Sequence, residues 1–215
     1  YTLSLHDALP ILGMGTSGLK IGFIGESHSV GAFGSSLMKA LSQKGDVRRL
    51  AIGGSSSFYW NRKDSYEFKW GFVFDEWKQN AVSATIFSRG SKISLSREVM
   101  EDFFVEGQFD VVIIQLMDNQ LSYSASANSQ SIQDLLKSIR QSNGKPFQCF
   151  FVSATHKDIP GIYPSITNKI KRNFIDTVLQ PTLVSSDCQL VDSMEIMPLS
   201  QVHTTDGLHL DSQSG

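Results

Sequence analysis

Short apolar runs alternate along this chain with longer segments in which apolar residues recur every three or four positions. The runs predict buried strands at residues 20–25, 47–52, 109–116, 147–152 and 189–191. The longer segments predict helices at residues 30–41, 96–107, 130–140 and 165–179. Strands that alternate with helices and are apolar throughout indicate a parallel sheet covered on both faces. We therefore predict an α/β fold, a flavodoxin-like three-layer α/β/α sandwich around a central, mainly parallel, five-stranded sheet.

Local signals mark several ends of these elements. Ser96 is a predicted N-cap, and Glu98 lies in the first helical turn, where a negative charge is favoured. Lys44 and Gly45 predict the end of the first helix, because a cation and a glycine are common there. Residues 55–85 lack a clear period and are rich in aromatic side chains. We expect them to form an irregular insertion that packs on the body or lines a substrate site.

The length and composition fit one globular domain. The chain has 215 residues, of which 40% are hydrophobic and 19% charged, which is enough for a core without metals or disulfides. The segment Tyr1–Ile11 has no basic start and carries a histidine and an aspartate, so it is a poor signal peptide. It looks like translated sequencing-adapter read-through. We treat residues 1–12 as a non-native segment and 18–215 as the domain, and localisation stays open between the cytoplasm and a periplasmic or secreted location.

The charge pattern bears on the class of partner. The formal net charge is −2 and basic residues are scattered, so neither nucleic acid nor an anionic membrane is an expected partner. A short cluster at Lys169, Lys171 and Arg172 is interpreted as a solvated helix face. No run of the sequence approaches the roughly 20 apolar residues that a membrane span needs.

The two cysteines, Cys149 and Cys188, leave their own state open. They can form one disulfide or stay apart, and their spacing does not decide between these states. Because Cys149 lies in an apolar run, we favour a buried thiol. Neither cysteine has the spacing of a metal ligand, and the five histidines form no HxxxH pair. The sequence therefore predicts no metal and no other cofactor.

Residues that can carry chemistry follow four of the predicted strands. Ser27 lies where the first strand turns into a helix, and a glycine pair ending at Gly54 follows the second strand. Asn119 follows the third strand, and Asp206 precedes His209 by three positions after the fifth. The carboxyl ends of parallel strands meet at one edge of a sheet, which is where ligands bind in such folds. Each motif alone is common, but together they define one candidate site.

In this order the motifs resemble the four sequence blocks of the SGNH/GDSL hydrolase family, over residues 21–210. GESHS stands for the family's Gly-Asp-Ser block, GGSS for its glycine block, MDNQ for its Gly-x-Asn-Asp block and DGLH for its last block. Three positions depart from the family's pattern: Glu26 replaces an Asp, Met117 a Gly and Gln120 an Asp. The resemblance implies the SGNH hydrolase fold and a serine hydrolase that needs no cofactor.

The resemblance also implies a role for each residue. Ser27 is the expected nucleophile, His209 its general base, and Asp206 the acid that orients the imidazole. The N–H groups of Ser27 and Gly54 and the side-chain amide of Asn119 are the expected oxyanion hole. Family members usually continue past the last block into a further helix, whereas this chain ends shortly after it. We therefore expect a domain that is truncated at its C-terminus.

Other residues near these strand ends have open roles. His28 is expected behind the triad or at the rim of the site. His28, His156 and Tyr59 are the weaker candidates for substrate contact. Aromatic residues such as Tyr59 more often pack an insertion than stack on a sugar ring. Asp118 fits either a surface acid or a residue that supports the site.

Three functions fit these residues. The favoured one is an esterase that hydrolyses a short acyl ester, in the first place acetyl, on a carbohydrate or cell-wall glycan. The second is an acyltransferase that passes the acyl group to a sugar hydroxyl with the same residues. The third is a non-catalytic glycan-binding module that retains the fold. The expected partner is therefore a small-molecule or glycan ester, and the oligomeric state is open.

Overall fold

The computed structural model describes residues 18–68, 71–78, 81–88, 93–157, 163, 165–204, 206 and 208–210. The predicted non-native segment 1–12 and the C-terminal residues 211–215 lie outside this described part of the chain.

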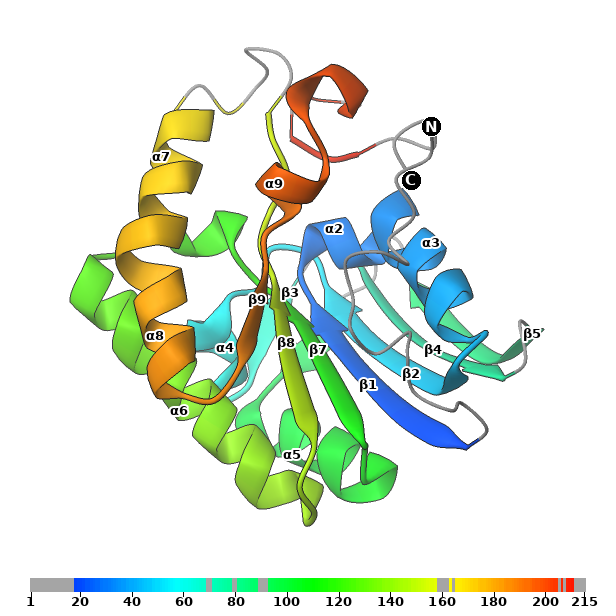
Figure 1. Ribbon diagram of the computed structural model, residues 1–215. Coiled ribbons are helices and arrows are strands. Elements are labelled where there is room, and N and C mark those ends of the chain that lie inside the picture. The colour runs from blue at the N-terminus through cyan, green and yellow to red at the C-terminus, as the bar shows by residue number, and fades with distance from the viewer. Residues whose placement is uncertain are drawn as a thin grey trace.

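Seven strands form one mixed sheet in the order β5-β4-β2-β1-β7-β8-β9 (Figure 1). Five of them pair in parallel, namely β2 (Gly45–Ile52), β1 (Leu19–Gly25), β7 (Val111–Gln115), β8 (Gln148–Val152) and β9 (Gln189–Val191). Numbered by their order in the sequence, these five lie as 2-1-3-4-5, which is the flavodoxin-like order. The predicted three-layer α/β/α fold with a mainly parallel sheet is confirmed.

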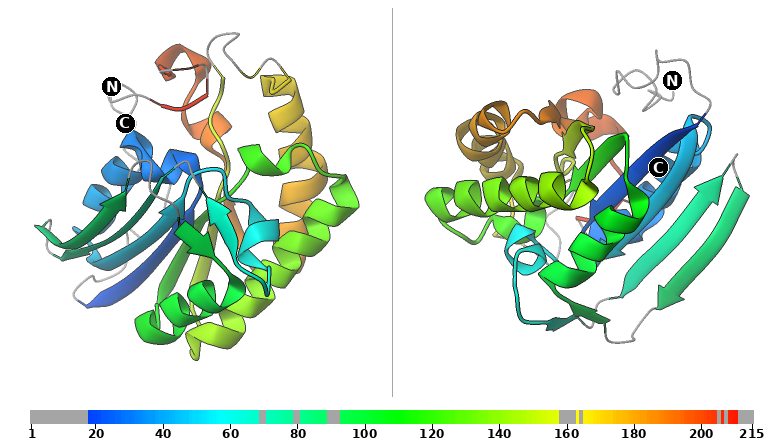
Figure 2. Two further views of the ribbon diagram at one scale, coloured as in Figure 1. Left: turned by 180° about the vertical axis from the view of Figure 1, so that it is seen from behind. Right: turned by 90° about the horizontal axis from the view of Figure 1, so that it is seen from below.

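The predicted number of strands was wrong, because residues 55–85 are not irregular. They contain α4 (Ser57–Trp60), β3 (Tyr66–Phe68), β4 (Phe72–Lys78) and the start of β5 (Ala81–Ser88). β4 pairs antiparallel with β2, and β5 pairs antiparallel with β4, so both extend one edge of the sheet (Figure 2). β3 forms a separate two-stranded ladder with β6 (Ile93–Leu95).

A buried ion pair joins this antiparallel edge to the turn that carries Ser27. Arg49 on β2 binds Asp75 on β4 through two contacts, Nε–Oδ1 at 2.8 Å and Nη2–Oδ2 at 2.6 Å. Arg49 Nη1 also donates to the Ser29 carbonyl at 2.7 Å. A bidentate pair offsets part of the desolvation cost of two buried charges. β4 lacks a recognisable strand pattern in the sequence because charged Asp75 lies on its buried face.

Helices cover both faces of the sheet (Figures 1 and 2). One face packs against α3 (Ala32–Leu41), which follows the short helix α2 (Ser27–Val30). The other face packs against α5 (Arg97–Gly107), α6 (Ala125–Asn143), α7 (Asn168–Phe174), the π-helical segment η3 (Ile175–Leu179) and α8 (Gln180–Ser185). Three short elements complete the fold, namely η2 (Asp118–Gln120), α9 (Ser193–Ile196) and η4 (Leu199–Gln201). Among the described helices, none combines the length and apolar character required to cross a membrane.

Two helix ends show where the local signals worked and where they failed. The side chain of Ser96 accepts a hydrogen bond from the N–H of Val99 at 3.4 Å, so the predicted N-cap of α5 is confirmed. The first predicted helix ends at Leu41 as expected but is interrupted at Gly31, and the end signal at Lys44 and Gly45 was wrong. Gly45 instead begins β2, and a Cβ at this position would lie 2.1 Å from the Leu19 carbonyl oxygen. This glycine is therefore required by close strand packing rather than by a helix end.

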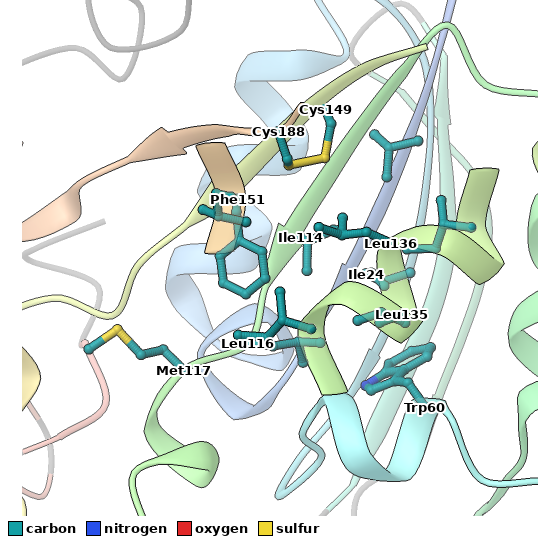
Figure 3. Close-up of a cluster of buried hydrophobic side chains, with 14 of the residues drawn as sticks. Ile24, Trp60, Ile114, Leu116, Met117, Leu135, Leu136, Cys149, Phe151 and Cys188 are labelled. Carbon is teal, nitrogen blue, oxygen red and sulfur yellow. A yellow bond between two sulfur atoms is a disulfide. The ribbon is translucent and has the colours of Figure 1, made fainter. Parts of the chain in front are cut away.

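Cys149 and Cys188 form a disulfide within the larger apolar cluster (Figure 3). Phe150 of β8 pairs with Gln189 of β9, so the residues that precede them lie side by side, with Cα atoms 4.7 Å apart. The prediction of a buried Cys149 was right, but the prediction of a free thiol was wrong. The apolar run predicts burial alone, whereas the pairing follows from the register of two strands that are distant in sequence.

Removal of this disulfide is expected to destabilise the protein. The cross-link closes a loop between residues 39 positions apart, and such links contribute about 2–4 kcal/mol to the free energy of unfolding. Cys149→Ala combined with Cys188→Ala should lower the urea midpoint accordingly, as measured by circular dichroism. Equal midpoints for this variant and the oxidised wild type would contradict the prediction, and wild type reduced with dithiothreitol is the matched control.

Candidate active site

Ser27 lies on a sharp turn between β1 and α2. The turn needs a glycine at its start, because a Cβ on Gly25 would lie 1.9 Å from Ser29 Oγ. Ser29 Oγ in turn donates to Gln115 Oε1 at 2.7 Å, which ties the turn to the neighbouring strand β7. Ser27 itself is half-buried at the carboxyl end of β1. This is the point of the 2-1-3-4-5 strand order where the order reverses, and ligands bind there in open α/β sheets.

The structure brings together the three residues that the sequence predicts as a triad. His209 Nε2 lies 2.8 Å from Ser27 Oγ, and His209 Nδ1 lies 2.7 Å from Asp206 Oδ2. The loop that carries Asp206 and His209 is closed by a bridge between Thr204 and Leu210, and Leu210 is buried against the α3 face. Ser27 is therefore within proton-transfer distance of an imidazole whose other nitrogen is held by a carboxylate.

Asp206 is held as an ionised acceptor. Its Oδ1 accepts the backbone N–H groups of Leu208 at 3.0 Å and His209 at 2.9 Å, while Oδ2 faces the imidazole. Burial works against ionisation, but these backbone bonds and the His209 ring outweigh it and lower the pKa of Asp206 below its ordinary value. The carboxylate can therefore stabilise a positive charge on His209 over the neutral and mildly acidic range.

Besides the Ser27 N–H on the turn after β1, the predicted oxyanion donors lie on the loops that follow β2 and β7. The N–H of Gly53 donates to the Gly71 carbonyl at 2.9 Å, so this glycine is already engaged. Gly54 follows with a φ of 80°, which favours a glycine. The side-chain amide of Asn119 donates to Glu26 Oε2. Because an amide nitrogen carries two hydrogens, this bond leaves Asn119 a second donor for a substrate oxygen.

Comparisons with known proteins bear on the fold. No protein-family model matches the sequence, and a search of curated proteins finds no match. Solved structures do match over nearly the whole chain. An SGNH hydrolase from Slackia heliotrinireducens has a TM-score of 0.60 at 15% identity, covering 91% of this chain and 91% of that one. An arylesterase from Agrobacterium tumefaciens has a TM-score of 0.56 at 14% identity, covering 93% and 92%. A peptidoglycan O-acetylesterase has a TM-score of 0.53 at 10% identity, covering 97% and 89%.

The chain has the SGNH hydrolase fold. The sequence prediction of this fold is confirmed. The structure accommodates each of the three departures from the SGNH blocks.

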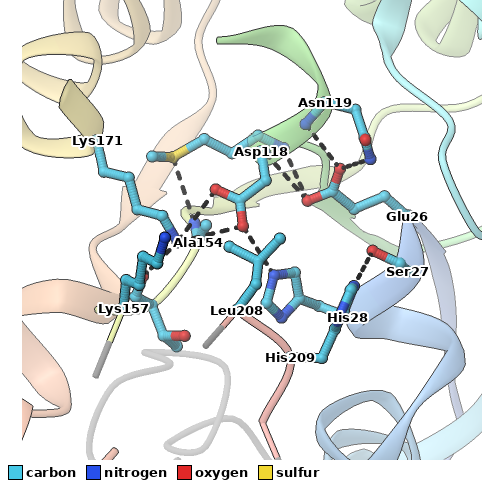
Figure 4. Close-up of polar contacts among 12 residues, drawn as sticks. Glu26, Ser27, His28, Asp118, Asn119, Ala154, Lys157, Lys171, Leu208 and His209 are labelled. Carbon is cyan, nitrogen blue, oxygen red and sulfur yellow. Dashed lines mark hydrogen bonds and ion pairs between the residues drawn. The ribbon is translucent and has the colours of Figure 1, made fainter. Parts of the chain in front are cut away.

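Glu26, which replaces the Asp of the first SGNH block, connects the turn that carries Ser27 with the loop that follows β7 (Figure 4). Its fully buried carboxylate accepts a hydrogen bond from Gln115 Nε2 on β7 at 3.2 Å. It also accepts hydrogen bonds from the loop after β7, namely from the backbone N–H groups of Met117, Asp118 and Asn119 at 3.1–3.4 Å and from the Asn119 amide. Burial and the nearby Asp118 raise the pKa of Glu26, although His28 and these backbone donors act in the opposite direction. The longer side chain thus holds the loop that carries Asn119.

The other two departures are also accommodated. Met117, in place of the SGNH glycine, has a φ of −140°, so this position does not require glycine. Its sulfur accepts the N–H of Ala154 at 3.3 Å. Gln120, in place of an Asp, is buried and bridges Ser57 Oγ at 3.1 Å and the Leu116 carbonyl at 2.6 Å.

His28 lies beneath the triad rather than at its rim. It is 4% exposed, its Nε2 lies 2.9 Å from Asp118 Oδ2, and its ring centroid is 5.1 Å from that of His209. Asp118, which the sequence left open between two roles, is therefore a buried supporting acid. The interpretation of the Lys169–Arg172 cluster as a solvated face was wrong for Lys171, which is fully buried against Asp118. A lysine with a buried partner looks the same in sequence as one that faces solvent.

The three buried side chains of Glu26, His28 and Asp118 also have the spacing of a metal site. Glu26, His28 and Asp118 each place one possible ligand atom within 4.8 Å of the others. The Glu26 oxygens, however, accept N–H donors, and the Lys171 ammonium lies 3.2 Å from the Asp118 carboxylate. A bound cation would meet a positive charge here, so we assign these residues to an ion-pair network.

The other two weaker candidates for substrate contact, His156 and Tyr59, follow β8 and β2 in the chain. His156 follows β8 and is half-buried, with Nε2 2.9 Å from the Met194 carbonyl oxygen. Tyr59 on α4 packs against Tyr66 at a ring distance of 4.5 Å. Burial, together with contacts to Tyr123 and Tyr66, raises the pKa of Tyr59 to about 12. Tyr123, which was not singled out from the sequence, packs against Phe58 at a ring distance of 4.1 Å.

Proposed function

We propose that this chain is a serine esterase that hydrolyses a short acyl ester, in the first place an acetyl ester on a carbohydrate or cell-wall glycan. The observation that carries the proposal is the pair of contacts on His209, one to Ser27 Oγ and one to Asp206. This arrangement activates an alcohol as a nucleophile. Fold neighbours named arylesterase and peptidoglycan O-acetylesterase support an ester as the substrate class.

In the proposed acylation step the Ser27 hydroxyl attacks the ester carbonyl carbon while its proton passes to His209 Nε2. The Asp206 carboxylate stabilises the imidazolium that forms. The carbonyl oxygen becomes an oxyanion, which the N–H groups of Ser27 and Gly54 and the Asn119 amide bind. Collapse of this intermediate breaks the bond to the alcohol, which leaves with the proton from His209.

In the proposed second step water replaces the alcohol. The acyl group is now an ester of Ser27, and water attacks its carbonyl carbon while His209 accepts a water proton. The second tetrahedral intermediate collapses to the free carboxylic acid, and the proton on His209 returns to the Ser27 oxygen. A sugar hydroxyl in place of water would make the same sequence of steps an acyl transfer.

An aromatic cluster supports the glycan part of the proposal. Phe58 packs on Tyr123 at 4.1 Å, and Tyr59 packs on Tyr66 at 4.5 Å. Tyr66 and Tyr123 are 38% and 40% exposed, so parts of the cluster are open to a ligand. Phe58 and Tyr59 follow Gly54 closely in the chain, and Tyr123 follows Asn119 closely. Rings with an apolar face and a hydroxyl tip suit the mixed apolar and polar surface of a sugar.

Hydrolysis assays test the proposed function. We expect the purified protein to hydrolyse p-nitrophenyl acetate faster than the octanoate ester, and to release acetate from acetylated glycans. A fluorophosphonate probe should modify Ser27 and stop both reactions, as located by mass spectrometry. If the protein neither reacts with the probe nor cleaves any short ester, the proposal is wrong and the non-catalytic alternative gains support. Transfer of acetate to an added sugar at the expense of free acetate would favour the transferase.

Asn119→Ala is expected to lower kcat for p-nitrophenyl acetate about 10²–10³-fold with little change in KM, because an oxyanion donor acts mainly in the transition state. Asn173→Ala, at an exposed position of α7, is the matched control and should retain wild-type kinetics. Steady-state assays on both variants provide the measurement. A loss in Asn119→Ala below threefold would remove Asn119 from the oxyanion hole.

A further inference from the structure

Four buried ionisable side chains lie beneath the proposed triad, in a cluster that the proposed chemical steps do not use (Figure 4). Lys171 contacts Asp118, Asp118 contacts His28, and Glu26 places a carboxylate oxygen within 4.8 Å of both Asp118 and His28. None of these side chains belongs to a residue more than 5% exposed. Buried charges are costly unless they are paired, so this cluster requires a physical reason.

Lys171 differs from the other basic residues of its helix. Lys169 is exposed and Arg172 is half-buried, whereas Lys171 is fully buried. Its Nζ lies 3.2 Å from each carboxylate oxygen of Asp118 and donates to the Thr155 carbonyl at 2.9 Å. Burial of an ammonium group is costly, and an uncharged side chain of similar length would fill the same space without that cost. Packing alone therefore does not account for a lysine at this position.

Asp118 connects the Lys171 charge with the loop that carries Asn119 and with His28, which follows the nucleophile. It directly precedes Asn119, and its backbone N–H donates to Glu26 at 3.1 Å. Its carboxylate lies 2.9 Å from Nε2 of His28, the residue after the nucleophile. Burial opposes ionisation of Asp118, but attraction to Lys171 and the bond with His28 outweigh it, so the pKa of Asp118 is lowered.

The two carboxylates of the cluster oppose one another. After burial, the charge of Asp118 is the largest influence that raises the pKa of Glu26. Without the positive charge of Lys171, uptake of a proton by one of the two carboxyl groups would become easier. A protonated carboxyl is a weaker acceptor, and the N–H bonds to Glu26 are the ones that hold the loop carrying Asn119.

We propose that Lys171 is a positioning residue whose buried ammonium fixes Asp118 and, through it, the oxyanion loop (residues 117–119) and the His28 ring. The Asn119 amide then meets the substrate oxygen in one orientation. The His28 ring, which packs at 5.1 Å against His209, supports the general base from below. Lys171 itself does not touch the substrate. The inference rests on the proposed function, because it assigns Lys171 to that reaction.

The kinetic test compares Lys171→Met, Lys171→Arg and the exposed control Lys169→Met. We expect Lys171→Met to lower kcat for p-nitrophenyl acetate at least about tenfold while KM stays within about threefold, because misaimed donors act on the transition state. Lys171→Arg keeps the charge and should recover part of the rate. Asp118→Asn removes the partner charge and should show the same loss, so it carries the comparison if Lys171→Met does not fold.

The pH profile separates positioning from simple packing. Within the described part of the chain, the titratable groups that face Asp118 are Glu26, His28 and Lys171, with His209 behind His28. Loss of the Lys171 charge favours the protonated acids, so Lys171→Met should lose activity at a higher pH than the wild type as the pH falls. Lys169→Met should follow the wild-type profile.

Amide hydrogen exchange at residues 117–119 gives a readout that does not need activity. We expect faster exchange there in Lys171→Met and wild-type exchange in Lys169→Met. Unchanged kcat, pH profile and exchange in Lys171→Met would overturn the inference, and so would a lowered Tm without these changes. A wild-type protein with no esterase activity and no labelling at Ser27 would instead remove the proposed function, while the exchange data would still decide whether Lys171 holds the loop.

Discussion

Replacement of Ser27 by alanine is expected to lower kcat for p-nitrophenyl acetate by about 10⁴–10⁶-fold, because the proposed covalent step has no other nucleophile. The substitution removes one oxygen atom at a half-buried position, so folding should be retained. His209 would lose its 2.8 Å contact to the hydroxyl but keep its bond to Asp206. Any remaining rate would come from the oxyanion donors acting on a water attack.

The double variant makes this prediction sharper. Ser27→Ala, His209→Ala and the combination of both should have nearly the same rate, because the two residues act as one unit and their effects do not add. Ser126→Ala, an exposed serine of α6, is the matched control, and melting curves should show that all variants fold. Rates for Ser27→Ala within tenfold of the wild type would rule out Ser27 as the nucleophile.

Sequence reasoning predicted the parallel part of the sheet because its strands carry a strong local signal. The five apolar runs lie in parallel strands buried on both faces, where no alternation is expected. The strand β4 was not predicted because the burial of its side chains depends on β2, a partner that is distant in sequence. Asp75 on β4 can point into the protein core because Arg49 on β2 forms an ion pair with it. A charge that is neutralised by a distant residue hides the pattern of the strand that carries it.

In the candidate site, too, the local motifs were predictable from the sequence and the tertiary contacts were not. Ser27, Asp206 and His209 lie within hydrogen-bonding distance in the order that the sequence blocks suggest, because strand ends bring short motifs to one edge. The supporting contacts were not predictable from those motifs. In the sequence, Lys171 resembles a surface residue, and only the packing of α7 against the oxyanion loop shows that it is buried. Glu26 resembles a conservative replacement, and only the structure shows that its carboxylate accepts N–H donors from that loop. These contacts depend on tertiary packing, which no motif spacing records.

Replacement of Asp206 by asparagine is expected to lower kcat by about 10⁴-fold, because a neutral amide cannot stabilise the imidazolium and its N–H₂ group disturbs the required tautomer. Asp206 now accepts from the backbone with Oδ1 and from the His209 ring with Oδ2. An asparagine has one acceptor oxygen, so it can preserve the backbone bonds or the ring bond but not both. Asp134→Asn, at an exposed position of α6, is the matched control and should keep wild-type kinetics.

The stability of Asp206→Asn provides a second, independent measurement. The pKa of Asp206 is lowered in the folded protein, so the ionised form contributes stability that is fully present above its unfolded pKa and is lost as the pH falls through its folded pKa. The Tm of Asp206→Asn should therefore lie below that of the wild type near neutral pH, and the gap should narrow as the solution is acidified. Calorimetric scans across the acidic range measure this gap. A gap that widens toward acid, or a kcat within tenfold of the wild type, would show that Asp206 does not hold the imidazole as an ionised partner.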